Sequence, residues 1–258
     1  MILLLAGTSD ARILARLIKE QGMKVTATVV NERTAREIER IGVRVHVGRM
    51  SAEAFTEMIQ KQGITAVVDA SHPFAEEASL NAIQATANCQ VPYLRYERPK
   101  LEFIHSSLIP VESYREAAEL ATQKKGVILL TTGSKTLPLF AEKLNNQPDI
   151  RVLTRILPRM ESLLVCEKLG FAQENIIAIQ GPFSKELNKA IYQQFGVTLM
   201  ITKESGQAGS VDEKVAAAIE LGIETIMIRR PSITYGTVYS QYEDVIKHLQ
   251  RIREEDES

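Results

Sequence analysis

Short runs of aliphatic and β-branched residues alternate with amphipathic stretches along the whole chain. This alternation is typical of βαβ units, in which parallel strands are joined by helices that pack against the sheet. A first series of strands is expected at residues 2–5, 24–30, 43–47, 66–69 and 93–96, and a second at 127–130, 150–153, 176–179, 198–201 and 225–228. The pattern therefore predicts an α/β fold with two Rossmann-like domains, each a parallel sheet flanked by helices, and a ligand cleft between them.

The pattern is weakest between residues 97 and 111, where Arg98 and Pro99 precede a segment without clear periodicity. A length of 258 residues suits one to two domains, because a domain takes roughly 150 residues. We expect an N-terminal domain over residues 1–98, an interdomain segment over 99–111 and a C-terminal α/β domain over 112–258.

Composition and charge exclude several classes of protein. The net charge is −1, from 31 basic and 32 acidic residues, so no overall field favours nucleic acid or an anionic membrane. The two cysteines are distant from each other, which indicates neither a disulfide framework nor a metal site. The first residues lack the basic segment of a targeting peptide, and no apolar run approaches the roughly 18 residues of a membrane helix. We expect a cytoplasmic protein with a small-molecule ligand, and its oligomeric state stays open.

The first expected strand is followed at once by Gly7, Thr8 and Ser9. A buried strand, a tight turn and a helix start aim backbone N–H groups at an anion, so this turn suits a phosphate. The dinucleotide fingerprint GxGxxG is absent, because Gly7 is the one glycine here, and a plain helix N-cap explains the same residues. Both interpretations stay open at this point.

The second expected strand ends shortly before Glu32 and Arg33, where a Rossmann domain contacts the adenosine ribose of its cofactor. An acidic residue at this place favours NAD, whereas a nearby arginine favours the 2′-phosphate of NADP. Arg33 and Arg36 therefore favour NADPH, with NADH as the alternative cofactor. Solvated residues at the start of a helix would give the same pattern.

A polar cluster with a proline-fixed turn follows the fourth expected strand, at Ser71, His72 and Pro73. In open parallel sheets the carboxyl ends of the strands face the ligand. His72 is therefore placed for a functional role, although packed or capping histidines are more common.

Two segments of the C-terminal half combine hydroxyl groups, glycine and a cation after an expected strand. The segment from Thr131 to Lys135 opens a helix, but its spacing differs from the GxxxxGK[ST] pattern of a Walker ATPase, so an anion-holding turn is the better interpretation. Lys203 ends another strand shortly before Gly206, a combination suited to a phosphate or a carboxylate.

Seven short segments carry a resemblance that covers essentially the whole chain: Gly7 to Asp10, Asp69 to Ala75, Tyr93 to Pro99, Thr131 to Lys135, Gly181 to Phe183, Thr202 to Gly206 and Arg229 to Pro231. In this order they resemble the precorrin-6A reductases and cobalt-precorrin-6A reductases of cobalamin biosynthesis. The chain departs from the usual motifs at Asp10, Ser71, Glu204 and Ser210, each by a small change that affects contact geometry.

The resemblance implies an oxidoreductase that transfers a hydride from a nicotinamide cofactor to a conjugated double bond of a ring-contracted tetrapyrrole. Residues assigned to the cofactor site are Gly7, Thr8, Ser9, Arg33, Ser71, His72, Pro73, Thr132, Gly133, Ser134, Lys135, Gly181, Pro182, Phe183, Lys203, Ser205 and Gly206. Residues assigned to the substrate carboxylates are Arg95, Arg98, Arg229 and Arg230, because arginine binds carboxylates with two parallel hydrogen bonds. His72 and Tyr235 are candidate proton donors, with water as the alternative, and no metal ligand is assigned.

Two alternatives to a reductase remain at this point, because fold alone does not define function. One is a nucleotide-sensing module that binds its ligand without turnover. The other is a cofactor-free tetrapyrrole synthase of similar two-domain architecture. Whether the macrocycle already carries cobalt is left open as well.

Overall fold

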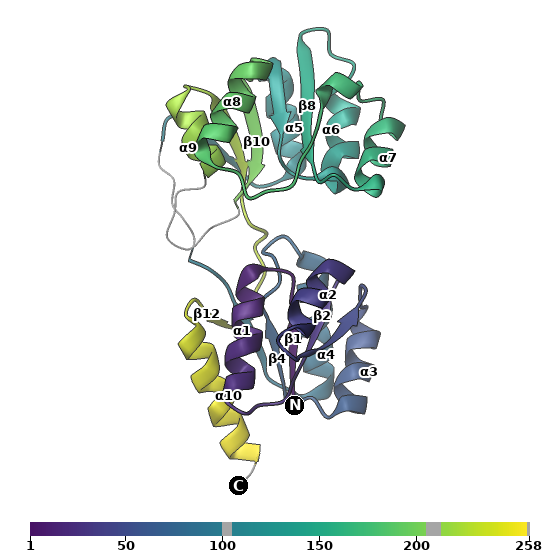
Figure 1. The fold of residues 1–258 in the computed structure, drawn as a ribbon, viewed down its shortest axis with the longest axis vertical. Coiled ribbons are helices and arrows are strands. Elements are labelled where there is room, and N and C mark those ends of the chain that lie inside the picture. Colours follow the sequence, from purple (N-terminus) through teal and green to yellow (C-terminus); the bar gives the residue numbers. More distant parts are fainter. Residues whose placement is uncertain (100–104, 205–212, 257–258) are drawn as a thin grey trace. The chain divides into compact units, whose positions relative to one another are not determined.

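The computed structural model describes residues 1–99, 105–204 and 213–256, which form two compact units (Figure 1). The first unit contains Met1–Pro99 and Pro231–Ser258, and the second contains Lys100–Arg230. Each unit is built on one parallel sheet. The predicted α/β fold with two Rossmann-like sheets is confirmed, whereas the ligand cleft stays a prediction.

The sheet of the first unit has the strand order β12-β5-β4-β1-β2-β3, and all neighbours are parallel. Its strands are β1 (Ile2–Leu5), β2 (Val25–Val29), β3 (Arg44–Val47), β4 (Ala66–Asp69), β5 (Tyr93–Tyr96) and β12 (Thr237–Tyr239). Its helices are α1 (Ser9–Glu20), α2 (Glu32–Glu39), α3 (Ala52–Gln62), α4 (Glu76–Cys89) and α10 (Tyr242–Asp256).

The sheet of the second unit has the order β6-β11-β10-β7-β8-β9 and is parallel as well. Its strands are β6 (Leu108–Val111), β7 (Gly126–Leu130), β8 (Ile150–Ile156), β9 (Ile176–Ala178), β10 (Leu199–Lys203) and β11 (Glu224–Ile228). Its helices are α5 (Tyr114–Lys124), α6 (Leu137–Leu144), α7 (Met160–Lys168), α8 (Lys185–Phe195) and α9 (Glu213–Glu220), with short 3₁₀ turns at η1 (Ser134–Thr136) and η2 (Gln173–Asn175).

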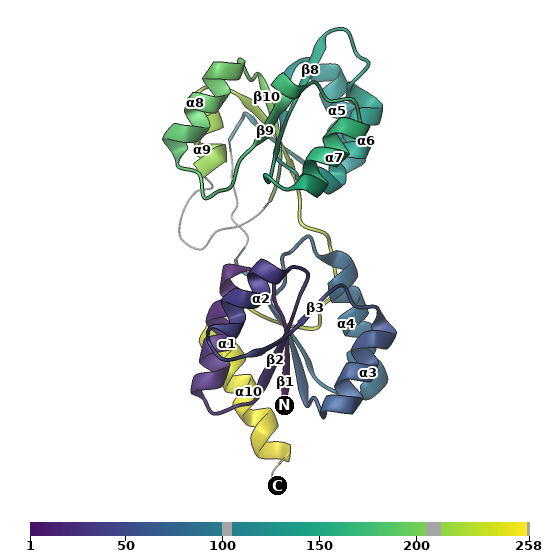
Figure 2. The same cartoon turned by 45° about the vertical axis from the view of Figure 1, so that its right-hand side comes forward.

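Strand β1 is apolar at every position because helices cover both faces of its sheet. Leu4 belongs to a buried cluster with residues of α1, α2 and α10, whereas Leu3 belongs to a cluster with residues of α3 and α4. Figure 2 shows α1 and α10 on one face of this sheet and α3 and α4 on the other. Consecutive buried residues are therefore the signature of a central strand here. No helix of the described ranges is both long and apolar enough to span a bilayer.

The expected domain boundaries are wrong at two places. Residues 108–111, predicted as interdomain segment, form the edge strand β6, where Pro110 is tolerated because an edge strand leaves some N–H positions unused. Residues 231–256, predicted as part of the C-terminal domain, belong to the first unit. There β12 pairs with β5, and α10 buries Val245 and Leu249 in the core around Leu4. A local pattern does not reveal which sheet edge accepts a short strand, so sequence order suggested the wrong unit.

Candidate functional site

Three loops meet at the carboxyl edge of the first sheet, because β1 lies between β2 and β4 and the three strands are parallel. They follow β1 at residues 6–8, β2 at 30–31 and β4 at 70–75. Thr8 Oγ1 donates a hydrogen bond to the carbonyl oxygen of Ala70 (2.9 Å), which joins the first loop to the third. The predicted Gly7–Ser9 turn and the predicted Ser71–Pro73 turn are thus brought together.

The turn after β1 serves as a helix cap and also leaves open space. Thr8 Oγ1 accepts a hydrogen bond from Ala11 N–H (3.2 Å) and so caps α1. Gly7 is exposed, and a Cβ at this position would meet no atom within 4 Å. The N-terminal end of α1, which favours negative charge, is therefore approachable beside Gly7.

Arg33 lies in the first turn of α2, two residues after the Asn31 cap that follows β2. Its side chain is 66% exposed and pairs with Glu37 (Nε to Oε1, 3.4 Å), which also pairs with Arg12 of α1. Exposed pairs of this kind contribute little to stability. The location fits the predicted contact with a ribose phosphate, and that contact stays a prediction.

The loop between β4 and α4 carries His72 at the surface. His72 Nδ1 accepts a hydrogen bond from Phe74 N–H (3.2 Å), so the neutral imidazole carries its proton on Nε2. Ala75 N–H donates to the His72 carbonyl oxygen (2.7 Å) and closes the turn around Pro73. The loop therefore orients the imidazole with Nε2–H as its donor.

A buried ion pair lies beside this loop. Arg95 Nη1 is 3.0 Å from Asp69 Oδ1, and both side chains are 0% exposed. Asp69 also accepts hydrogen bonds from Ser71 N–H (2.9 Å), Ser79 Oγ (2.6 Å) and Tyr93 Oη (2.7 Å). Burial and the neighbouring Asp69 raise the pKa of the Tyr93 phenol, so Tyr93 stays a donor. The burial of Arg95 does not fit its predicted contact with the substrate.

Tyr235, the second candidate proton donor, covers this ion pair in the first unit. Arg95 Cζ lies 4.8 Å from the centroid of the Tyr235 ring. Burial raises the pKa of the Tyr235 phenol, and the positive charge of Arg95 opposes this effect. Arg95 Nη1 also donates to Ser71 Oγ (3.3 Å), which connects the pair to the loop that carries His72.

Arg98, predicted to bind a substrate carboxylate, has partners within the first unit. Arg98 Nε lies 2.5 Å from Asp10 Oδ2, and Nη2 donates to Ser9 Oγ (2.9 Å). Tyr242 of α10 donates to the other oxygen of Asp10 (2.7 Å) and stacks on Tyr96. Asp10 therefore ties together α1, the end of β5 and α10, and it holds Arg98 beside the predicted phosphate turn.

In the second unit, the predicted anion-holding turn follows the inner strand β7. The hydroxyl of buried Thr132 lies 2.7 Å from that of Thr136, and the Ser134 hydroxyl lies 3.2 Å from that of Ser162 in α7. Gly133 has φ +91°, a conformation that L side chains rarely adopt. These contacts fix the turn at the N-terminus of α6, which carries no side-chain cap.

Three lysines gather beside this turn: Lys135, Lys203 and Lys214, called the lysine cluster below. Lys203 ends β10, the neighbour of β7. Burial and the charges of Lys214 and Lys135 lower the pKa of Lys203 to about 8. Gathered positive charges favour the binding of an anion. The sequence predicts Lys135 and Lys203 but not Lys214, which looks like an ordinary surface lysine of α9.

The remaining predicted residues of the second unit are engaged with neighbours. Phe183 follows Gly181 and Pro182 in the sequence. Its ring lies over the guanidinium of Arg155, with 4.5 Å between the ring centroid and Arg155 Cζ. Arg155 Nη1 in turn donates to Asn188 Oδ1 (2.7 Å). This stack makes the Gly181–Phe183 turn part of the same carboxyl edge, next to the end of β8.

The two arginines that follow β11 are paired with acidic residues of the second unit. Arg230 is 7% exposed, its Nε lies 3.6 Å from Glu204 Oε1, and its backbone N–H donates to Glu204 Oε2 (3.2 Å). Like that of Arg95, this burial does not fit the predicted contact with a substrate carboxylate. Arg229 is exposed and pairs with Glu112 (2.8 Å). Ser205 and Gly206, predicted for the cofactor site, lie outside the described residues.

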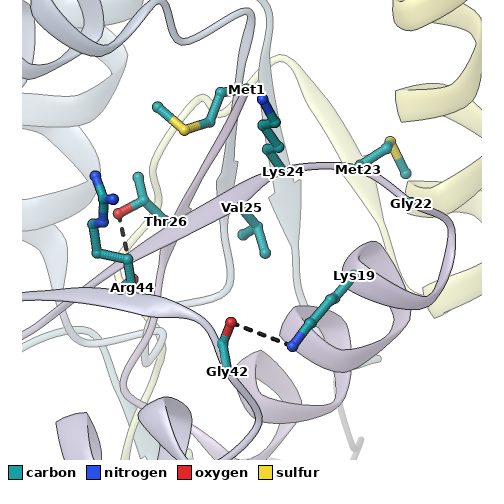
Figure 3. A pocket seen from close by; sticks show the side chains of 9 residues that line it. All are labelled: Met1, Lys19, Gly22, Met23, Lys24, Val25, Thr26, Gly42 and Arg44. Carbon is teal, nitrogen blue, oxygen red and sulfur yellow. Dashed lines mark hydrogen bonds between the residues drawn. The ribbon is translucent and has the colours of Figure 1, made fainter.

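A hollow of about 390 Å³ lies at the opposite, amino edge of the first sheet (Figure 3). Lys19, Lys24 and Arg44 contribute to its lining, and none of the predicted site residues does. Lys19 Nζ donates to the carbonyl oxygens of Ile41 (2.8 Å) and Gly42 (3.3 Å) after the end of α2. Helix carboxyl ends disfavour an anion, so the candidate site is at the carboxyl edges. In the described part of the chain no group of three or more His, Cys, Asp or Glu side chains is arranged to hold a metal.

Comparison with known proteins assigns the chain to a family. Residues 1–250 match the sequence model described as Precorrin-6x reductase CbiJ/CobK. The chain is 57% identical over 249 residues to the cobalt-precorrin-6A reductase of Priestia megaterium (96% of this chain, 98% of that protein) and 36% identical over 258 residues to that of Methanothermobacter thermautotrophicus (97% and 84%). A solved structure, CobK precorrin-6A reductase, shares the fold with a TM-score of 0.81 at 24% identity, covering 97% of this chain and 96% of that chain. This chain therefore belongs to the Precorrin-6x reductase CbiJ/CobK family.

Proposed function

We propose that this protein is an oxidoreductase of cobalamin biosynthesis that reduces cobalt-precorrin-6A. A hydride from NADPH and a proton add across one conjugated double bond of the macrocycle. The observation that carries the proposal is the 57% identity, along nearly the whole chain, to a protein named cobalt-precorrin-6A reductase. We expect the protein to act in the cytoplasm, without a nucleic-acid or membrane partner.

The cobalt-containing substrate is proposed on the same ground. Two of the relatives named cobalt-precorrin-6A reductase are 57% and 36% identical to this chain, whereas a relative named precorrin-6A reductase is 28% identical. The test supplies NADPH with either cobalt-precorrin-6A or the metal-free macrocycle and records NADPH absorbance and a product gain of two hydrogens. We expect kcat/KM to be at least about tenfold higher for the cobalt form. An equal or reversed ratio contradicts the choice of substrate, and no turnover of either contradicts the function.

The residues at the carboxyl edge of the first sheet fit a dinucleotide. Backbone N–H groups at the start of α1 suit a phosphate, and the space beside Gly7 is open for it. Bound there, NADPH supplies the hydride. The Ser71 hydroxyl lies in the loop that Thr8 holds to the first loop, and the Ser9 hydroxyl lies at the start of α1. Ser71 Oγ accepts from Arg95 and Ser9 Oγ accepts from Arg98, so each hydroxyl can donate its own proton to the same ligand.

A proton must reach the carbon next to the one that accepts the hydride. His72 is exposed and keeps Nε2–H as a donor, because Nδ1 is occupied by Phe74 N–H. Tyr235 remains a second candidate, and its ring lies on Arg95 rather than in open solvent. The exposure of His72 supports it as the donor, with water as the alternative.

The lysine cluster is proposed to hold a phosphate or a carboxylate. Lys203 is partly buried at the end of β10, and its lowered pKa reflects burial together with repulsion by Lys214 and Lys135. The neighbouring turn at Gly133 and the uncapped α6 add backbone donors. NADPH carries phosphates and the tetrapyrrole carries carboxylates. Whichever of the two binds less tightly after a substitution in the lysine cluster is therefore the ligand of the cluster.

Replacing Arg33 with alanine is expected to reduce the preference for NADPH over NADH by about tenfold, because a charge-assisted contact contributes about 1.5–3 kcal/mol. The measurement is kcat/KM with each cofactor. Arg40→Ala, at the exposed end of α2, serves as the control and should leave the ratio unchanged. If the wild type uses both cofactors equally well, Arg33 does not bind the 2′-phosphate.

Replacing Arg98 with alanine is expected to raise the substrate KM about tenfold. Arg98 is held by Asp10 and is followed by a proline, which restricts its backbone. Because Arg98 also donates to Ser9 beside the predicted phosphate turn, NADPH affinity is measured on the same variant. Arg159→Ala, which removes an arginine paired with Glu161, is the control. Unchanged KM, or a loss of NADPH affinity alone, would show that Arg98 does not bind a substrate carboxylate.

A nucleotide sensor or a cofactor-free synthase makes different predictions for the same purified protein. A sensor would change NADPH fluorescence without oxidising NADPH in the presence of either macrocycle. A synthase would not change NADPH fluorescence at all. Binding followed by oxidation in the presence of cobalt-precorrin-6A supports the reductase.

A further inference from the structure

Arg95 was expected to bind a substrate carboxylate, yet its side chain is 0% exposed. A buried arginine has to act through the residues that it touches. Its guanidinium contacts the carboxylates of Asp69 (3.0 Å) and Glu97 (3.5 Å) and the hydroxyl of Ser71 (3.3 Å). The face of the same guanidinium lies against the ring of Tyr235, at 4.8 Å.

Asp69 fixes the position of this guanidinium. Its carboxylate is fully buried and takes hydrogen bonds from Ser71 N–H, Ser79 Oγ and Tyr93 Oη at 2.6–2.9 Å, so its own place is set by the end of β4 and by α4. The register of the sheet pairs Asp69 with Arg95 across β4 and β5. The guanidinium is thus held by backbone pairing and by a carboxylate that itself has little freedom.

Tyr235 has no comparable support from its own segment. It precedes Gly236, which has φ +77°, and the three-residue edge strand β12, in which Val238 pairs with Arg95. A stacked guanidinium attracts an aromatic ring, and the attraction is largest where water is excluded. Backbone pairing with β5 therefore positions β12, whereas the Arg95 guanidinium and a hydrogen bond with Ser79 hold the Tyr235 ring.

We propose that Arg95 is a positioning residue for Tyr235: with Asp69 behind it, the guanidinium forms the platform that holds the Tyr235 ring beside the loop carrying His72. Arg95 then influences catalysis only through Tyr235 and makes no contact with the substrate. The effect on catalysis rests on the proposed function, whereas the positioning itself does not.

Positioning is tested without substrate by placing a fluorescent ring at residue 235. The chain contains no tryptophan, so Tyr235→Trp creates a single indole emitter. In this background Arg95→Met removes the charge, and Arg95→Lys keeps a positive charge but loses the planar face. The matched control is Tyr114→Trp, whose ring would contact Phe140 in the second unit, with the same Arg95 substitutions.

In the Tyr235→Trp background we expect Arg95→Met to shift the indole emission to longer wavelength and to raise its acrylamide quenching about twofold, because the ring loses its platform. Arg95→Lys should have a smaller effect of the same sign. The control emission should stay unchanged in all variants, which shows that the second unit is intact, and an unchanged thermal melt shows that the first unit remains folded. Unchanged emission and quenching of the indole at position 235 in both Arg95 variants would overturn the proposal. If Arg95→Met unfolds the protein, Arg95→Lys decides alone.

Catalysis provides the second readout. Arg95→Lys and Tyr235→Leu are expected to lower kcat about tenfold each, to leave the substrate KM within about twofold of wild type, and to combine without further loss in the double variant. A rise in KM for Arg95→Lys alone, additive with Tyr235→Leu, would indicate a substrate ligand and overturn the proposal. If no variant turns over any substrate while the indole emission at position 235 responds to Arg95, the proposed function fails and the positioning role stands.

Discussion

Gly7→Val is expected to weaken dinucleotide binding by about 100-fold or more while leaving the protein folded. A phosphate at the start of α1 receives two or more charge-assisted N–H contacts of about 1.5 kcal/mol each, and a valine side chain would occupy its place. The fold tolerates the change because a Cβ at Gly7 meets no atom within 4 Å and the backbone there is not left-handed. Titration of NADPH fluorescence and a thermal melt measure the two effects.

Gly42→Val is the matched control at the opposite edge of the same sheet. Gly42 has φ +74°, where a β-branched residue is strained, and its Cβ would collide with Lys19 Nζ. We expect a lower Tm with NADPH affinity unchanged at a temperature where the variant is folded. Equal loss of affinity in both variants would mean that the stability of the first unit, and not contact with phosphate, explains the effect of Gly7→Val.

The alternation of apolar runs predicted most strands well because both sheets are parallel and buried. Strands such as β1 and β7 are covered on both faces, so their sequences are continuous apolar runs that local inspection detects. The sequence pattern does not predict β6 and β12, because neither is a long, continuous apolar run. Each is an edge strand of three or four residues, and β6 contains Pro110. Their pairing partners lie far away in sequence, so only tertiary structure reveals that β12 and α10 complete the first sheet.

The sequence indicates which loops form the candidate site, but it does not indicate which of the charged side chains are buried or paired. Gly7, His72 and Gly133 follow the carboxyl ends of parallel strands, as the sequence indicates. Which arginine faces a ligand depends on burial and on acidic partners, neither of which follows from sequence spacing. Arg95 is buried on Asp69, and Arg98 is held by Asp10. The seven segments that carry the family resemblance mix exposed residues such as Gly7 and His72 with buried residues such as Asp69 and Arg95.

Lys203→Met is expected to weaken binding of the anionic ligand by about 10- to 100-fold at pH 7, since a contact with a charged group contributes about 1.5–3 kcal/mol. In the wild-type protein the pKa of Lys203 is lowered to about 8, so the side chain loses its charge as pH rises through that value. Affinity should therefore fall about tenfold between pH 7 and pH 9. The variant should show no such fall, because it has no charge to lose. Separate titrations with NADPH and with the macrocycle identify the ligand involved.

The stability of the same variant separates binding from folding. The ordinary pKa of a lysine is 10.5, and the pKa of Lys203 is lowered in the folded protein, so folding disfavours its charged form. This cost is fully present below pH 8 and disappears as pH rises through 10.5. Lys203→Met should consequently raise Tm at pH 7, and the gain should shrink as the pH approaches 10.5.

Lys135→Met, which removes an exposed neighbour, should move the fall in affinity to higher pH by relieving repulsion on Lys203. If Lys203→Met is more stable than the wild type and also binds the anion less tightly, misfolding does not explain the lower affinity. The lysine cluster would then be a ligand site that lowers the stability of the protein. Lower Tm together with unchanged affinity would show that Lys203 serves the fold alone.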